Sequence, residues 1–258
     1  MRTIEVQYGY ENRAKGGRNM PVSLTVDNRE DAAMEGSVEF LCRQADGELY
    51  AYAYPLVLAA GENKRSSYVV PLSAGSDAFW VRLKNEAGEI TEVRQFDLTQ
   101  SSSEPELFIG VLSDTPELLS YLNGVSVNYG QMKSRTFTLS ESSFPEDRRQ
   151  LDSFDLIVIS NYQVSKLSVQ QVRALMQWMR NGGVLLFGTG ERVNDTLGLF
   201  APEFLDDMYA QPESRDLPLA ATDGLTVQTP GTENEAEAPV SLPYVHLNLH
   251  GGSVVFSA

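Results

Sequence analysis

The feature that most constrains this chain is a change in the spacing of its apolar residues near residue 100. Before that point apolar and polar residues alternate with a period of two, which is typical of half-buried strands. After the polar segment 99–106, continuous apolar runs alternate with a helical period. Two different periods on either side of a polar segment predict two domains, 1–98 and 107–258, joined by a linker at 99–106.

The first part of the chain contains short strand patterns and no helical pattern. Glycine-containing turn signals such as Asp46-Gly47 and Ala87-Gly88 separate the strands. Seven short strands of this kind predict an all-β sandwich with immunoglobulin-like architecture over residues 1–98. The expected strands are Thr3–Tyr8, Val22–Val26, Ser37–Arg43, Leu49–Tyr54, Ser67–Leu72, Phe79–Lys84 and Ile90–Phe96.

The second part alternates strand and helix patterns. Leu107–Leu112, Leu156–Ile159 and Val184–Phe187 are continuous apolar runs, as expected for strands covered on both faces. Alternating strands and helices predict an α/β fold with a doubly wound parallel sheet. The residues from about 210 to 240 are rich in acids, Pro and Gly, and we expect a long acidic surface loop there.

Helix starts are visible between these strands. Ser168 precedes a helical pattern with Gln171 three positions later, which is a capping box. Thr115-Pro116-Glu117 combines a capping residue, a proline at the first helical position and an early acid, so it predicts a second helix start. We expect Leu118, Leu119 and Leu122 to form the apolar face of that helix.

Charge and hydropathy exclude two functional classes. Lys plus Arg is 20 and Asp plus Glu is 35, so the net charge is −15. A field of that sign repels phosphate backbones, and we expect no nucleic-acid partner. No apolar run reaches the roughly 18–20 residues that span a bilayer. The chain ends in a buried-strand pattern, Gly252–Phe256, so we expect a fragment whose export signal or membrane anchor lies outside it.

The chain contains few residues of the types that bind zinc. Cys42 is the only cysteine, and His246 and His250 are the only histidines, so a structural zinc site of the Cys/His type cannot be completed. The two histidines lie in an alternating segment, on the polar face of an expected strand. The segment Gly188–Val193 lacks the third glycine of a dinucleotide fingerprint, and no Walker lysine motif occurs. We therefore predict no metal and no cofactor.

Three segments of the second part resemble the class I glutamine amidotransferase-like, flavodoxin-like fold: Phe154–Asn161, Leu167-Ser168 and Met179–Gly190. More narrowly, they resemble noncatalytic members found in the extracytoplasmic parts of bacterial membrane proteins. Tyr8-Gly9-Tyr10 and Pro21–Asn28 resemble the β-sandwich that precedes the domain in such proteins.

The catalytic pattern of that family is missing here. Glutamine hydrolysis needs a cysteine on a sharp strand-to-helix turn, with a histidine and an acid to activate it. No Gly-x-Cys-x-Gly string occurs, Cys42 lies in the first part, and His246 is followed by Leu247 and Asn248 rather than by the family's His-x-Glu. A Gly-x-Ser-x-Gly elbow is also absent. The departures touch every member of the triad and argue against glutaminase activity.

Polar residues follow the expected parallel strands, where ligands bind in open sheets. They would gather at one edge as a vestigial pocket for a small polar ligand. On the alternative interpretation, the same side chains only cap helices and shape loops. The candidates are Ser113, Asp114, Asn161, Tyr162, Thr189 and Glu191.

The leading functional hypothesis is a noncatalytic interaction or scaffold ectodomain of a membrane-anchored bacterial protein, with protein partners at the cell envelope. The first alternative is an amidotransferase-like hydrolase with a non-Cys site that depends on Ser113 or Asp114. The second is a carbohydrate-binding module using Tyr50, Tyr52 and Tyr54, which share one strand face. A cytoplasmic location is the alternative to an extracytoplasmic one.

Overall fold

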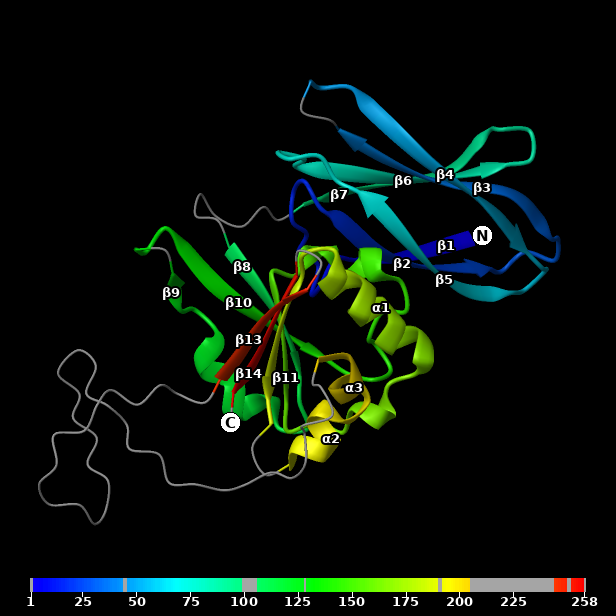
Figure 1. Ribbon diagram of the computed structural model, residues 1–258. Helices are drawn as coiled ribbons and strands as arrows, with labels where there is room; N and C mark the ends of the chain where they lie inside the picture. The colour runs from blue at the N-terminus through cyan, green and yellow to red at the C-terminus, as the bar shows by residue number, and fades with distance from the viewer. Residues whose placement is uncertain are drawn as a thin grey trace, which may run out of the picture.

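The computed structural model describes residues 2–43, 46–98, 106–127, 129–189, 192–204, 244–249 and 252–257 (Figure 1). The strands are β1 Arg2–Tyr8, β2 Asn19–Asn28, β3 Met34–Arg43, β4 Leu49–Leu58, β5 Asn63–Pro71, β6 Ala78–Asn85, β7 Ile90–Asp97, β8 Glu106–Leu112, β9 Ser126–Val127, β10 Met132–Leu139, β11 Leu156–Ser160, β12 Val184–Gly188, β13 Tyr244–Leu249 and β14 Gly252–Ser257. The α-helices are α1 Val169–Arg180, α2 Val193–Leu197 and α3 Ala201–Phe204, and the 3-10 helices are η1 Pro116–Leu122, η2 Arg148–Ser153, η3 Val164–Lys166 and η5 Gly198–Phe200.

The first part consists of two antiparallel sheets. Strands lie in the order β1-β2-β5 in one sheet and β4-β3-β6-β7 in the other. Alternate residues of both sheets point into one shared core, whose largest members include Met20, Leu24, Phe40, Phe79 and Leu83. The period-two pattern arises because successive side chains of a strand point to opposite faces. The two facing sheets agree in this respect with the predicted sandwich.

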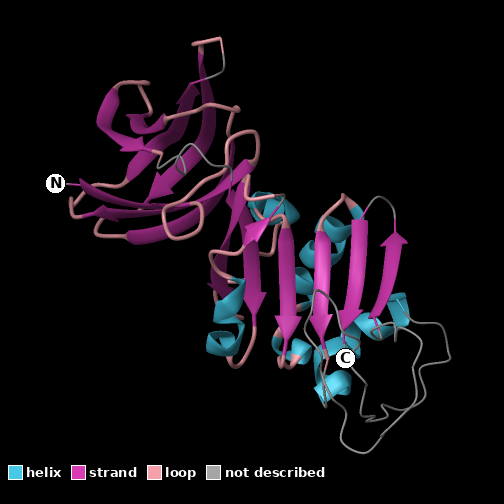
Figure 2. Cartoon of the chain, turned by 90° about the vertical axis from the view of Figure 1, so that its left-hand side faces the viewer, coloured by secondary structure: helices cyan, strands magenta, loops and turns pink. Residues whose placement is uncertain are grey.

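The second part is built on a seven-stranded mixed sheet with the order β13-β14-β12-β11-β8-β10-β9 (Figure 2). Its central neighbours pair in parallel, whereas β9 and β13 pair antiparallel at the two edges. The parallel strands include the apolar runs identified in the sequence. Parallel strands need crossover connections. Among the described residues, the helices in the connections from β8 to β10 and from β10 to β11 are 3-10 helices, whereas α1 lies between β11 and β12.

The prediction of a doubly wound, flavodoxin-like α/β fold is wrong. The described chain is mostly β, with two antiparallel sheets beside the mixed one, and α1 is its only α-helix longer than five residues. The large core, which includes Leu175 and Trp178 of α1, covers one face of the mixed sheet. On the other face lies a small core whose buried members are Ile109, Val111 and Val158.

The reason for the error lies in the helix start predicted at Thr115. The threonine side chain makes no capping hydrogen bond, and the segment forms the 3-10 helix η1 with no buried residue. Leu118 is 68% exposed, while Leu119 and Leu122 pack against the small core. The capping box at Ser168 and Gln171 is confirmed, and it begins α1.

Some predicted segments cannot be compared with the structure. Residues 99–105 of the linker and the acidic segment at about 210–240 lie outside the described residues, and Glu106 begins β8. Among the described residues, no helix has the length and hydrophobicity to cross a bilayer.

A hairpin after β1 joins the two parts. Glu11 and Asn12 adopt positive φ values of 51° and 57°, which lets the chain reverse between Tyr10 and Arg13. The Tyr10 ring lies against Phe154, at 4.2 Å between centroids, and its hydroxyl donates to the Gln150 carbonyl oxygen at 2.9 Å. Burial raises the pKa of the Tyr10 hydroxyl.

Polar contacts extend this attachment. We call it the joint, and it consists of the contacts of residues 10–19 with η2, Phe154 and Asp155. Lys15 forms an ion pair with Asp155, and Arg18 lies 3.4 Å from the other oxygen of that carboxylate. The Ser153 hydroxyl donates to the Asn19 carbonyl oxygen at 3.1 Å. The joint therefore combines an inserted aromatic ring with charge-assisted hydrogen bonds, and both restrict movement between the parts.

Candidate functional site

An ion cluster lies at the carboxyl ends of β8, β11 and β12. One carboxylate oxygen of Asp114 accepts from Lys166 Nζ at 2.8 Å, and the other lies 3.3 Å from Arg192 Nη1. Hydrogen bonds and the charges of Lys166 and Arg192 hold the pKa of Asp114 below its usual range. Arg192 also pairs with Asp195 at 3.1 Å. The charged groups of this cluster therefore neutralise one another.

Asn161 is the first residue after β11 and connects this strand to the cluster through hydrogen bonds. Its φ of 47° is in the left-handed region, where asparagine is one of the few residues other than glycine found regularly. Its side-chain oxygen accepts from Arg192 at 2.9 Å, and its amide nitrogen donates to the Thr115 hydroxyl at 2.9 Å. The Asp114 backbone N–H donates to the Asn161 carbonyl oxygen at 3.2 Å.

The other predicted pocket residues have local roles. Ser113 Oγ accepts from the Thr115 backbone N–H at 3.1 Å, and the Thr189 carbonyl oxygen accepts from the Arg192 N–H at 3.1 Å. Tyr162 is buried, and burial with the nearby carboxylates of Glu141 and Asp114 raises its pKa to about 12. Glu191 lies outside the described residues.

Sequence reasoning missed the two cations of this cluster. Lys166 and Arg192 follow the ends of β11 and β12, as the predicted residues do, so the same positional argument could have identified them. Lys166 Nζ also lies 5.2 Å from the centroid of the Tyr162 ring. With both cations included, the polar groups of the cluster pair with one another and with neighbouring loops. This agrees with the alternative interpretation, in which these side chains shape loops.

Replacing Asp114 by Asn should destabilise the chain in a pH-dependent way. Because the pKa of Asp114 is lowered, its ion pairs stabilise the fold above the ordinary carboxyl pKa of about 4 and lose this effect as pH falls through the lower folded-state pKa. We expect Asp114→Asn to lose about 1 kcal/mol at pH 7, since these partly exposed pairs are screened by solvent. Urea denaturation at pH 7 and near pH 2 measures both values.

The control for this prediction is Glu86→Gln, which removes an exposed carboxylate on the β6–β7 turn and should change stability by less than about 0.5 kcal/mol. If Asp114→Asn lowered the free energy of unfolding by the same amount at both pH values, the ion-pair explanation would be contradicted.

The cysteine that could act as a nucleophile lies away from this cluster. Cys42 is buried in the core of the first part, and burial raises the pKa of its thiol to about 12. Among the described residues, no group of His, Cys, Asp and Glu could hold a metal ion. His246 lies in β13, and His250 lies outside the described residues.

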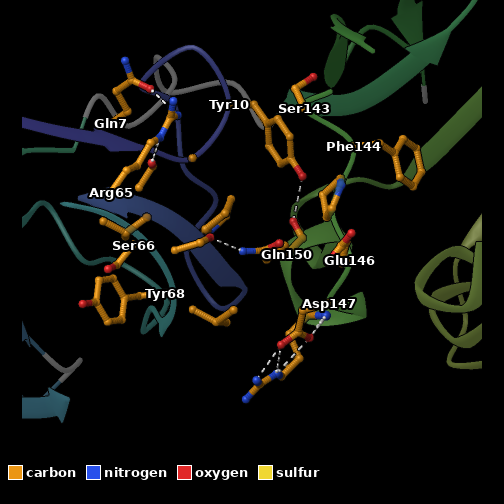
Figure 3. Close-up of a pocket in the computed structure, with 18 of the residues that line it drawn as sticks. Gln7, Tyr10, Arg65, Ser66, Tyr68, Ser143, Phe144, Glu146, Asp147 and Gln150 are labelled. Carbon is orange, nitrogen blue, oxygen red and sulfur yellow. Dashed lines mark hydrogen bonds and ion pairs between the residues drawn. The ribbon is translucent and has the colours of Figure 1, made fainter. Parts of the chain in front are cut away.

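A larger feature is the cleft between the two parts, with a volume of about 1450 Å³ (Figure 3). One side, the sheet wall, is formed by Gln7, Ser23 and the run Lys64–Val69. The opposite side, the loop wall, is formed by Ser142, Ser143, Glu146, Asp147 and Gln150. The two walls meet beside the joint, where Gln150 Nε2 donates to Ser67 Oγ at 2.7 Å. Sequence reasoning could not find this cleft, because its walls come from segments far apart in the chain.

The tyrosines proposed as a carbohydrate platform lie on β4. Tyr52 and Tyr54 pack against the core of the first part. The Tyr54 hydroxyl donates to the Val69 carbonyl oxygen at 2.9 Å, while Tyr50 is 50% exposed. Two of the three rings therefore support the sandwich rather than form an exposed stacking surface.

Comparisons with known proteins add little about function. Residues 2–99 are similar to a family described as a domain of unknown function (DUF8726). No curated protein matches. Among solved structures, the DNA glycosylase AlkC of Pseudomonas fluorescens is 15% identical with a TM-score of 0.28, and the match covers 38% of this chain and 30% of that chain. The putative ApaA protein of Bordetella pertussis is 13% identical with a TM-score of 0.28, over 39% of this chain and 96% of that chain. The CARDB domain of a Pyrococcus furiosus protein is 15% identical with a TM-score of 0.29, and the match covers 38% of this chain and 90% of that chain.

Proposed function

We propose that this chain is a noncatalytic interaction or scaffold unit, part of a membrane-anchored bacterial protein, that binds protein partners on the extracytoplasmic side of the cell membrane. The observation that carries this proposal is the joint. It attaches the first part to the second through the Tyr10 ring and through the ion pairs of Lys15 and Arg18 with Asp155.

A rigid joint suits a binding scaffold because it fixes the two walls of the cleft relative to one another. Preorganised surfaces lose less conformational entropy when a partner binds. The ion cluster at Asp114 supports the same proposal, since its carboxylate is committed to Lys166 and Arg192. The thiol of Cys42, with its raised pKa, is poorly suited to nucleophilic attack at neutral pH.

The test is the location and activity of the full-length gene product. Cells are fractionated, intact cells are treated with protease, and envelope partners are captured by cross-linking in living cells. We expect a membrane-bound product that external protease cleaves, together with cross-links to envelope proteins. A cytosolic product would overturn the proposal.

An activity screen separates the hydrolase alternative. The purified chain is incubated with glutamine and with a panel of amides and esters, beside the variants Ser113→Ala and Asp114→Asn. We expect no turnover by any of the three proteins. Turnover by the unmodified chain that either variant abolishes would establish a non-Cys hydrolase and overturn the noncatalytic proposal.

A further inference from the structure

Strand β5 is at the edge of its sheet, because the strand order is β1-β2-β5. The hydrogen bonds at both ends of the β2–β5 pair show which residues of β5 face β2. The Asn28 N–H donates to the Glu62 carbonyl oxygen, and the Leu72 N–H donates to the Arg18 carbonyl oxygen. Even-numbered residues of β5 therefore form the bonds to β2, since residues of a strand alternate in the direction of their backbone groups.

The odd-numbered residues of β5 direct their backbone groups away from β2. The Val69 carbonyl oxygen confirms this direction, because it accepts from the Tyr54 hydroxyl of β4. Within the described part of the chain, no hydrogen-bond partner is present for the backbone N–H and C=O of Arg65 and Ser67. Both residues are exposed. An unpaired strand edge of this kind can pair with another extended chain.

The cleft runs along this edge. Six consecutive residues of β5, Lys64–Val69, line it. Successive side chains of a strand point to opposite faces, so a cleft on one face would contact only every second residue. Contact with all six, through side chains and backbone together, fits a cleft that follows the strand edge.

The edge carries two cations in a chain whose net charge is −15. No carboxylate of the described residues forms an ion pair with Lys64 or Arg65. Arg65 is held by neutral groups instead, since its Nε donates to Ser23 Oγ at 2.8 Å and Nη2 lies 3.3 Å from Gln7 Oε1 (Figure 3). Lys64 donates to the Val57 carbonyl oxygen at 2.9 Å. These contacts direct the guanidinium over β2 and β1, so an acidic side chain of a strand beside β5 reaches its uncommitted Nη1 across the outer face of the sheet.

We propose that the cleft binds an extended acidic peptide segment of a partner protein, which adds to the sheet as a strand beside β5 and directs a carboxylate to Arg65. Main-chain hydrogen bonds to Arg65 and Ser67 hold the peptide, and the charged contact selects its sequence. The loop wall carries Glu146 and Asp147, and Asp147 is already paired with Arg149 at 2.6 Å. The acidic side chains of the peptide therefore face the sheet wall. This inference rests on the proposed function and names the surface and the class of partner.

The first experiment selects peptides from an unbiased display library of 12-residue sequences, using the whole chain as bait. We expect the enriched peptides to carry acidic residues among β-branched and aromatic ones. The most enriched peptide is then titrated into isotope-labelled protein, and amide hydrogen exchange is followed by NMR. New protection is expected at the amides of Arg65 and Ser67, which lack partners in the free chain. Enrichment of peptides without acids, or protection confined to other strands, would refute the proposal.

Two variants test the two kinds of contact. Arg65→Gln removes the cation, and Ser67→Pro removes an N–H that faces away from β2. Each should weaken peptide binding at least tenfold. The matched controls lie on β7, the edge strand of the other sheet: Arg94→Gln and Val93→Pro. The N–H of Val93 faces away from β6, because the next even-numbered residue beyond the strand, Leu98, bonds to Asp77. These controls should change the affinity less than twofold, and circular dichroism checks the fold of each variant.

Other occupants of the edge would give different results. If the amides of Arg65 and Ser67 became protected at high protein concentration without peptide, a second copy of the chain would occupy the edge. If a trimer of galacturonic acid protected the same amides and displaced the peptide, the site would be one for acidic glycans. Either result would overturn the peptide proposal. Both would leave the envelope location unaffected, whereas a cytosolic full-length product would overturn the proposed function without changing the peptide measurements.

Discussion

Replacement of Tyr10 by alanine is expected to uncouple the two parts of the chain. The ring is surrounded by Phe154 and Phe137, with centroids at 4.2 and 6.0 Å, and its hydroxyl bonds to the Gln150 carbonyl oxygen. Truncating this partly buried aromatic ring removes transfer energy and leaves a cavity, so we expect a loss of about 2 kcal/mol. The matched variant Tyr10→Phe keeps the ring and loses only the hydrogen bond, which corresponds to about 1 kcal/mol.

The two tryptophans allow this uncoupling to be measured. Trp80 lies in β6 of the first part, and Trp178 lies in α1 of the second. In the single-tryptophan backgrounds Trp80→Phe and Trp178→Phe, urea unfolding followed by fluorescence reports each part separately. With Tyr10 present the two transitions should coincide, as expected for one cooperative unit. With alanine they should separate. Transitions that still coincide would show that the ring does not couple the parts.

The sequence predicted the elements that are determined by residues close together in the chain. Each of the seven strands predicted in the first part overlaps one of β1–β7, since alternation is a local signal. The capping box at Ser168 was found for the same reason. The helix predicted from Thr115 failed because the residue types allow a cap that the tertiary structure does not use. There the threonine hydroxyl accepts from Asn161.

The cleft and the joint could not be predicted, because they depend on contacts between distant residues. Tyr10 and Gln150 are separated by 140 positions, and no local pattern in either segment indicates the other. The ion cluster was partly predictable. Asp114 and Asn161 were identified from their positions after strands, whereas the cations that bind them, Lys166 and Arg192, were not. Their pairing decides what the cluster can do chemically, so residue positions alone were insufficient for assigning a role.

Replacement of Gly9 by alanine is expected to disrupt the hairpin that carries Tyr10. Gly9 has a φ of 56°, and a Cβ atom placed there would lie 1.8 Å from the Arg13 carbonyl oxygen. That oxygen accepts the Tyr10 N–H at 2.9 Å, so it cannot move without breaking the turn. The left-handed backbone alone costs an L-residue about 1 kcal/mol, and relief of the overlap adds about 2 kcal/mol.

The matched control is Gly88→Ala. Gly88 has a φ of 79°, and no atom lies within 4 Å of the position of its Cβ, so only the conformational cost of about 1 kcal/mol applies. Urea unfolding of both variants separates the two effects. We expect Gly9→Ala to lose about 3 kcal/mol and also to separate the Trp80 and Trp178 transitions, because the turn that inserts the Tyr10 ring is lost. Equal losses for the two variants, with coincident transitions, would show that the hairpin adapts to a side chain at Gly9. The ring would then be positioned by its contacts with Phe137 and Phe154 rather than by the turn.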